Sequence, residues 1–266
     1  MDRYLSVIII IIFFHSCDKY EPDCCGTPKP INLSYPTSFP DPYNPLDNPL
    51  TEEGVNLGRH LFYDPILSSD NTISCASCHK QEYAFGDNTQ YSFGVNQSIG
   101  DRNAPTIINV AFQSHFDWDG KNISLEDQAQ RPIFNDIELH NNNWSEVIHR
   151  LQVSSIYPDL FCEAFGDELI DSIKVLNAIA QFERTLVSVD SKFDQWLRGE
   201  VAFTESEIDG FNIYSTERGD CFHCHPIGLF TDNSFHNNGL DAEFIDLGRY
   251  NVTSNPLDQG AFKSPT

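Results

Sequence analysis

Apolar residues recur at helical intervals in two long stretches of the chain. Residues 50–65, LTEEGVNLGRHLFYDP, begin with acidic side chains, continue with a run of apolar residues and end at a proline, as helices commonly do. Residues 171–188, DSIKVLNAIAQFERTLVS, repeat apolar residues at intervals of four, three and four: Val175, Ile179, Phe182 and Leu186. We predict a helix in each stretch and expect the second to lie in the core.

A third helix is expected over residues 204–214. Thr204 stands three residues before Glu207, the spacing of a capping box, and three apolar residues follow at helical intervals: Ile208, Phe211 and Tyr214. The preceding segment, residues 190–203, loses the helical period and contains a glycine, so we place a domain boundary there. No long run of Val, Ile and Thr alternates with polar residues, which argues against a sheet protein.

The first seventeen residues differ from the rest. MDRYLSVIIIIIFFHSC places an arginine before an apolar run that is too short to span a bilayer. We predict that residues 1–17 are an export signal. Ser16-Cys17 is similar to the site at which bacterial lipoproteins are cleaved and acylated, which would anchor the protein through Cys17. Phe14 and His15 are unusual before such a site, so a plain signal peptide with a chance cysteine is the alternative.

Residues 18–49 hold eight of the fifteen prolines and no periodic apolar pattern. Proline fixes φ and lacks an N–H donor, so we expect an extended tether or a surface wrap here. Cys24 and Cys25 lie inside this segment. Spacing alone does not decide between disulfides and unpaired thiols for them, and the role of Cys162 is equally open.

The charge of the chain limits its partners. With 39 acidic against 16 basic residues, the formal net charge is -23. This charge repels nucleic acid phosphates and anionic lipid and attracts basic proteins. We expect no nucleic acid partner, and a membrane contact only through the lipid anchor. The length of 266 residues suits one large or two ordinary domains.

Two Cys-x-x-Cys-His pentads carry the most specific chemistry. They are CASCH, residues 75–79, and CFHCH, residues 221–225. The two thiols of such a pentad lie about one helical turn apart and can both add to the vinyl groups of a haem, while the histidine binds the iron. We predict two covalently bound c-type haems, held by Cys75, Cys78 and His79 and by Cys221, Cys224 and His225.

Other uses of paired cysteines agree less well with the sequence. A four-cysteine zinc site needs both pairs to converge and has no need of a histidine beside each. A thioredoxin-like redox pair needs a βαβ setting that the sequence lacks. The predicted export agrees with covalent haem, because haem is attached outside the cytoplasm.

The segment between the pentads resembles one family. Residues 100–139 contain RNAPT and WDG, and further matching stretches span residues 57–87, 178–200 and 221–240. Together they resemble the bacterial di-haem cytochrome c peroxidases, including the related enzymes that mature the methylamine dehydrogenase cofactor. The resemblance runs from about Leu50 to the last residue.

The resemblance implies an all-α fold of two cytochrome c-like haem domains. Residues 50–195 would form the peroxidatic haem domain and residues 196–266 the electron-transfer haem domain. Only 41 residues follow His225, whereas the family continues into a segment with the sixth ligand of the second haem. We therefore expect the second domain to be truncated at the C-terminus. Asn103 matches one ligand of the family's calcium ion, and the other donors would lie beyond Thr266.

The family's catalytic residues match four positions. Trp118 corresponds to the tryptophan between the two haems, Gln128 to the distal glutamine, Pro132 to the pocket proline and Glu138 to the distal carboxylate. Heterolytic cleavage of a peroxide needs a group that takes a proton from one oxygen and returns it to the other. A desolvated carboxylate can do both. Without the resemblance, Glu138 and Trp118 would be read as a surface glutamate and a core aromatic.

One position departs from the family. Members that need reductive activation have a histidine seven residues before the RNAP arginine, and this chain has Val95 there. Valine cannot bind iron, so we expect the first haem to be open to peroxide, unless Tyr91 or Asn96 of the same loop approaches it. Six other histidines are expected to be surface or hydrogen-bonded residues: His60, His115, His140, His149, His223 and His236.

Three function classes follow. The resemblance implies a peroxidase that reduces hydrogen peroxide with electrons from a small cytochrome c or copper protein, in the periplasm or at the outer face of the envelope, with a homodimer as one arrangement. The first alternative is an oxidase that matures a protein-derived cofactor. The second is a di-haem electron carrier without catalytic activity.

Overall fold

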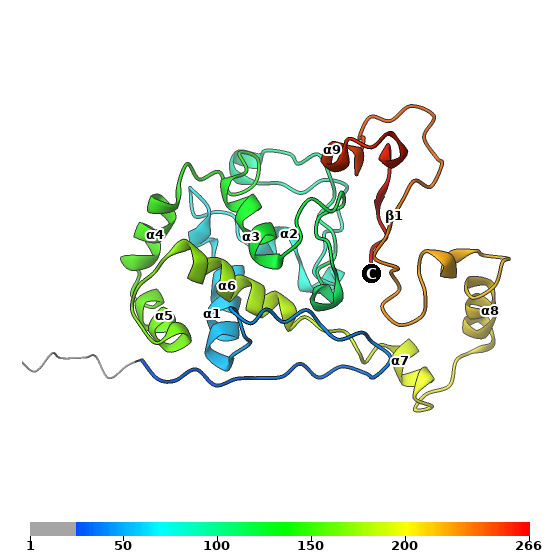
Figure 1. The fold of residues 1–266 in the computed structure, drawn as a ribbon, viewed down its shortest axis with the longest axis horizontal. Helices are drawn as coiled ribbons and strands as arrows, with labels where there is room; N and C mark the ends of the chain where they lie inside the picture. The colour runs from blue at the N-terminus through cyan, green and yellow to red at the C-terminus, as the bar shows by residue number, and fades with distance from the viewer. Residues whose placement is uncertain (1–24) are drawn as a thin grey trace, which may run out of the picture.

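The computed structural model describes residues 25–266, so the predicted export signal, Cys17 and Cys24 lie outside the described residues. The described chain is mostly helical (Figure 1), with one two-stranded antiparallel pair. The helices are α1 Glu52–Tyr63, α2 Cys75–Cys78, α3 Leu125–Phe134, α4 Trp144–Gln152, α5 Tyr157–Phe165, α6 Ser172–Arg184, α7 Lys192–Leu197, α8 Glu205–Tyr214 and α9 Tyr250–Thr253, and the strands are β1 Phe235–His236 and β2 Phe262–Lys263. From residue 25 onward, no helix has the length and apolar content needed to cross a membrane.

The core lies where α1 packs along α6. Gly58 of α1 faces the backbone of Ala178 in α6, where an added Cβ would overlap the carbonyl oxygen, so the glycine permits close helix packing. The buried core includes Leu57, Leu61, Val147, Leu151, Phe161, Val175 and Ile179. The two long helices predicted from the apolar pattern are confirmed, and α6 is buried. Leu186 lies beyond its end at Arg184.

Local capping explains where the helices begin. The Thr204 side chain accepts a hydrogen bond from the Glu207 N–H, and the Glu207 carboxylate accepts one from the Thr204 N–H, so the predicted capping box of α8 is confirmed. The segment of the predicted domain boundary, residues 190–203, contains the short helix α7, which the apolar pattern did not indicate. Ser191 and Asp194 form its capping box, and at six residues the helix is too short to show a period.

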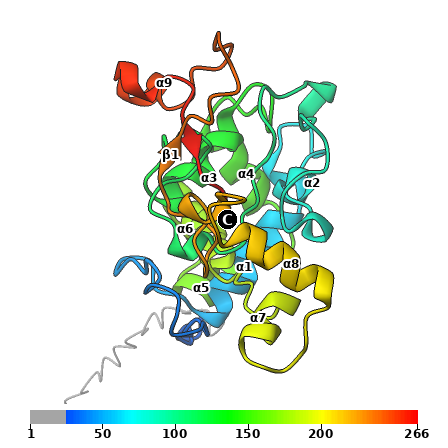
Figure 2. The ribbon, with the colours of Figure 1, turned by 90° about the vertical axis from the view of Figure 1, so that its right-hand side faces the viewer.

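The N-terminal strap, residues 25–49, is not a free tether. It has no helix and wraps along the molecule beside α6 towards α7 (Figures 1 and 2). Cys25 forms a disulfide with Cys162 of α5, 137 residues away. Farther along, Phe39 packs edge-on against Phe112, with ring centroids 5.2 Å apart, in a cluster that includes Leu229. The strap thus contacts the N-terminal part of the chain through Cys162 and the C-terminal part through Leu229.

A polar cluster fixes the end of the strap to the core. Gln181 of α6 accepts the backbone N–H of Thr51 and donates to the Asn48 side chain. Glu126 of α3 accepts hydrogen bonds from Asn48 and, through both oxygens, from Arg184. Arg184 is only 1% exposed, and this pairing with Glu126 neutralises its buried charge.

The segment at Asp119 and Gly120 holds the C-terminal part of the chain in place. Arg102 binds both oxygens of Asp246, at 2.7 and 2.9 Å, and an oxygen of Asp119 at 2.7 Å. Arg249 donates to the carbonyls of Asp119 and Gly120. Gly120 has φ +68°, and a Cβ there would collide with Phe235 and Arg249. The glycine of the WDG motif is therefore required by both backbone and packing.

We predict that removal of the disulfide destabilises the folded protein. Cys25→Ser should lower the free energy of unfolding by about 2–5 kcal/mol, because the cross-link restricts a long loop in the unfolded chain. Denaturant titration of the haem-loaded protein measures this, with Thr27→Ser as a control on the same strap. Equal midpoints for Cys25→Ser and wild type would show that the cross-link carries no stability.

Candidate haem sites

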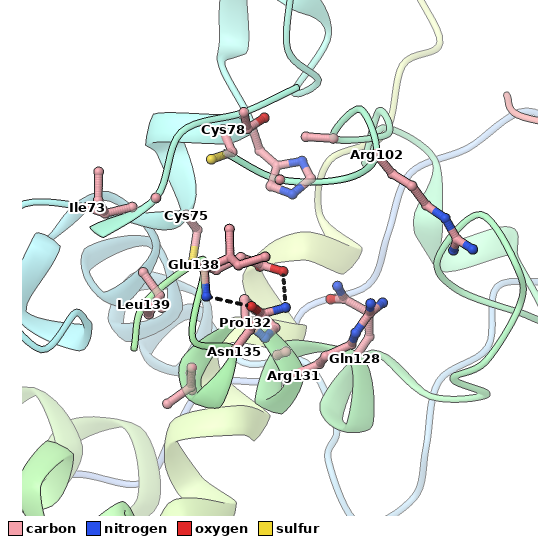
Figure 3. A pocket seen from close by; sticks show the side chains of 18 of the residues that line it. Ile73, Cys75, Cys78, Arg102, Gln128, Arg131, Pro132, Asn135, Glu138 and Leu139 are labelled. Atoms are coloured by element: carbon pink, nitrogen blue, oxygen red, sulfur yellow. Dashed lines mark hydrogen bonds between the residues drawn. The ribbon is translucent and has the colours of Figure 1, made fainter. Parts of the chain in front are cut away.

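The first pentad lines a large cavity in the N-terminal part of the chain. Its volume is about 1230 Å³ with the open mouth included. It lies between α2, α3, α6 and the loop around residues 92–105 (Figure 3). The walls include Cys75, Cys78, His79, Trp118, Gln128, Pro132 and Glu138. Residues predicted from four separate stretches of sequence thus line one space.

His79 is oriented by the backbone that follows it. Its Nδ1 lies 2.9 Å from the carbonyl oxygen of Phe85, so Nδ1–H donates there and Nε2 is left to bind a metal. Burial lowers the pKa of His79, although the carbonyls of Phe85 and Pro105 oppose the shift. A neutral imidazole is the form that binds iron.

The second pentad repeats this arrangement. His225 Nδ1 lies 2.7 Å from the carbonyl oxygen of Phe230, and the Tyr214 hydroxyl donates to the carbonyl of His225. Phe85 and Phe230 both have φ +56°, in the left-handed region that phenylalanine rarely adopts. Such strained residues cost about 1–3 kcal/mol each and cluster at functional sites. Here each strained phenylalanine places its backbone carbonyl beside the histidine ring of the preceding pentad.

A second cavity of about 800 Å³ adjoins the second pentad. Cys224, His225, His236 and Lys263 line it, and so does Trp118. His236 Nε2 lies 2.7 Å from a carboxylate oxygen of Asp232. Trp118 therefore borders both cavities.

The residues present fit two covalently bound haems. Cys75, Cys78, Cys221 and Cys224 are free thiols, while Cys25 and Cys162 are paired with each other. In each pentad the histidine N–H bonds to the first cysteine's carbonyl at 2.9 Å, which sets the spacing of the two thiols. Each histidine also keeps Nε2 for iron, because its Nδ1–H is engaged. A zinc site shared by the four cysteines does not fit, because Cys75 and Cys78 line the first cavity, whereas Cys224 lines the second.

Glu138 lies in the wall of the first cavity and is held by Asn135. The Asn135 side-chain amide donates to Glu138 Oε1 at 2.9 Å, and the Glu138 N–H donates to the Asn135 carbonyl at 3.1 Å (Figure 3). Burial raises the pKa of Glu138; Arg131 opposes this shift, and Asp117 and Asp101 add to it. The carboxyl group is thus oriented and has an increased proton affinity.

Helix α3 supplies the remaining polar wall. Gln128, Arg131 and Pro132 are spaced three and four residues apart, so they share one face. Pro132 lies inside the helix and has no N–H, which leaves the Gln128 carbonyl without its usual helical donor. Arg131 lies 3.2 Å from an oxygen of Asp117.

Trp118 is anchored to both halves of the chain. Its indole N–H donates to the carbonyl of Asn103 at 2.7 Å, and its own carbonyl accepts the N–H of Lys263 at 2.8 Å. The Asn103 side-chain amide donates to the carbonyls of Asp87 and Thr89. Of the Asn103 side chain, only the amide oxygen is therefore available to bind the calcium ion that the family resemblance implies.

Val95 and the two loop residues named as possible ligands of the first iron do not line the first cavity. Val95 is buried, and its N–H donates to the Glu138 carbonyl at 3.0 Å. Tyr91 and Asn96 are exposed and do not line the cavity. Hydrogen bonds or ion pairs engage the side chains of His60, His115, His140, His223 and His236.

Sequence reasoning missed Asn135, Phe85 and Phe230. A signal for the last two was present, since each pentad is followed by a phenylalanine two residues before an aspartate, in AFGD and in LFTD. The role of Asn135 depends on the turn after α3, which no spacing rule indicates.

The chain is similar to several known proteins. The family model described as di-haem cytochrome c peroxidase matches residues 52–202. The methylamine utilization protein MauG of Methylophilus methylotrophus is 37% identical over 233 residues, which cover 87% of this chain and 68% of that protein. Cytochrome c peroxidase Ccp of Escherichia coli is 35% identical over 248 residues, 88% of this chain and 52% of the relative. The chain therefore spans between about half and two thirds of these relatives.

A solved structure is also similar. It is a MauG-like protein associated with microbial copper homeostasis, with a TM-score of 0.81 and 34% identity over 88% of this chain and 74% of the other. The mostly helical fold is thus shared with a MauG-like protein.

We predict that each pentad holds one haem. Cys221→Ala with Cys224→Ala should remove one of two haem equivalents and leave the first, because the thioether bonds form on those sulfurs. Intact mass and a haem-stained denaturing gel measure the count, and Cys25→Ser is the control that should keep both haems. A wild-type chain with one haem or none would contradict the prediction.

Proposed function

The chain belongs to the di-haem cytochrome c peroxidase family, and on this basis we propose that it reduces hydrogen peroxide to water in the first cavity, with electrons relayed through the second. Each turnover combines one peroxide with two protons and two electrons to form two waters. The observation that carries the proposal is a buried, oriented carboxyl group, Glu138, in the cavity that holds Cys75, Cys78 and His79.

His79 and His225 would bind the two haem irons through Nε2, and the four free thiols would hold the porphyrins. When bound, haem supplies an iron that exchanges single electrons and, in the first cavity, a binding position for peroxide.

Glu138 would move the proton. Its carboxylate takes a proton from the nearer peroxide oxygen and gives it to the departing one, which leaves as water. Asn135 keeps Oε1 in place during this transfer. The raised pKa of Glu138 helps, because a group with higher proton affinity is a better base towards peroxide.

Gln128 and Trp118 would have separate roles. Gln128 shares the face of α3 with Pro132 and is available to orient peroxide by hydrogen bonding. Trp118 borders both cavities, so electrons that cross between them would pass its indole. The bond from its N–H to Asn103 fixes the ring in that position.

The partner and the compartment follow from charge and cysteine chemistry. The net charge of -23 favours a small basic redox protein as electron donor. The disulfide of Cys25 with Cys162 supports an oxidising compartment outside the cytoplasm. A lipid anchor at Cys17, a calcium ion at Asn103 and a homodimer complete the proposal.

A second candidate is oxidation of a protein substrate. The similarity to methylamine utilization proteins, 37% and 38% identity, is as high as the similarity to named peroxidases. Steady peroxide turnover with a small basic redox protein as the only donor would favour the first candidate over this one.

We predict that Glu138→Gln slows the reaction with peroxide by about 10²–10⁴-fold, because the amide cannot accept the proton. In wild type the rate should rise with pH through the raised pKa of Glu138, since the deprotonated form is the base. Stopped-flow mixing over a pH series measures both effects. Glu163→Gln, at an exposed position of α5, is the control. An unchanged rate in Glu138→Gln would rule out its role as the base.

We also predict that the all-ferric protein reacts with peroxide without prior reduction. Val95 offers no ligand, so the first haem should be high-spin with His79 as its protein ligand. Electron paramagnetic resonance and peroxide mixing test this. A wholly low-spin first haem that stays inert until one electron is added would overturn it.

A further inference from the structure

A second carboxyl group, distinct from Glu138, lies in the wall of the first cavity. Glu183 is in the last turn of α6, is only 6% exposed and lines the cavity with Cys75 and Ile179. Within the described residues, its buried Oε2 has no hydrogen-bond partner. A buried polar atom without a partner is costly and calls for an explanation.

The neighbouring charge does not neutralise Glu183. Arg184 follows it in α6 but binds both oxygens of Glu126 in α3, at 2.9 and 3.0 Å. Burial raises the pKa of Glu183 to about 8; Arg184 opposes this shift and Glu126 adds to it. From α2, Cys75 also faces it, but that sulfur no longer titrates once it is in a thioether. Burial therefore favours the neutral acid, whereas a positive charge placed in the cavity would favour the carboxylate.

Glu183 and Glu138 are built for different tasks. Asn135 holds the Glu138 carboxylate through a hydrogen bond, whereas no described side chain does so for Glu183. The protonation of Glu183 should therefore depend on the charge of whatever group occupies the cavity. Cys75 is a point of haem attachment and not an iron ligand, so Glu183 lies beside the edge of the site.

We propose that Glu183 takes up a proton when the first haem gains an electron and releases it when the haem is oxidised. Ferric iron accepts one electron from the redox donor and becomes ferrous, while the Glu183 carboxylate takes one proton from solvent and becomes a carboxylic acid. The positive charge lost at the iron and the negative charge lost at Glu183 offset each other, so the buried site keeps its net charge. This inference needs haem in the first cavity but not peroxide reduction.

The test is the reduction potential of the first haem against pH, measured by spectroelectrochemistry on the complete chain with both haems. In wild type, the potential should fall as pH rises towards about 8, where the carboxyl group titrates, with a limiting slope of about 59 mV for each tenfold drop in proton concentration. Glu183→Gln should be flat and match the acid limit of wild type, because glutamine is neutral at every pH.

Three comparisons make the test specific. Glu183→Asp keeps a carboxyl group, so the potential of the first haem should still depend on pH. Glu163→Gln, at an exposed position of α5, should behave as wild type. Glu138→Gln should keep the part of the pH dependence that comes from Glu183. The slope of the second haem should be the same in all of them. A wild-type slope that survives in Glu183→Gln, or a wild type without a slope, would overturn the proposal. The absorption spectrum of each variant shows that both haems are attached.

Discussion

Each of the two pentad histidines is oriented by one backbone carbonyl. The oxygens of Phe85 and Phe230 accept the Nδ1–H of His79 and His225, and this selects the tautomer with Nε2 free and fixes the ring. The carbonyls reach these positions because both phenylalanines adopt a left-handed conformation that costs energy.

The segment from Trp118 to Gly120 joins the two halves through adjacent residues. The Trp118 carbonyl accepts the N–H of Lys263, the Asp119 carbonyl accepts a hydrogen bond from Arg249, and Gly120 leaves room for Phe235. A shift of the C-terminal part would therefore also move Trp118, which borders both cavities. The same few contacts set the packing at this point and the separation of the two cavities.

The sequence predicted what is encoded locally. The pentads, the capping box at Thr204 and the apolar face of α6 each depend on residues a few positions apart, and the structure contains them. The pairing of Cys25 with Cys162 joins residues 137 positions apart, which spacing does not reveal. Helix α6 was predicted from its apolar residues alone. That Glu183 of this helix lines the cavity depends on how α6 packs in the folded chain, which the local sequence does not show. The roles of Trp118, Gln128 and Glu138 came from family resemblance, and the structure adds their positions.

The disulfide of the strap implies an order of assembly. In a chain that is exported from its N-terminus, Cys75 and Cys78 reach the oxidising side before Cys162 does, and they are nearer in sequence to Cys25. A thiol that is oxidised early bonds with whichever partner is present, and later correction needs thiol exchange. Haem attachment at Cys75 and Cys78, as proposed above, would remove these two competitors. The maturation of the first haem would therefore act as a protecting step for the correct cross-link, so that a failure of haem supply would also yield a wrongly paired strap.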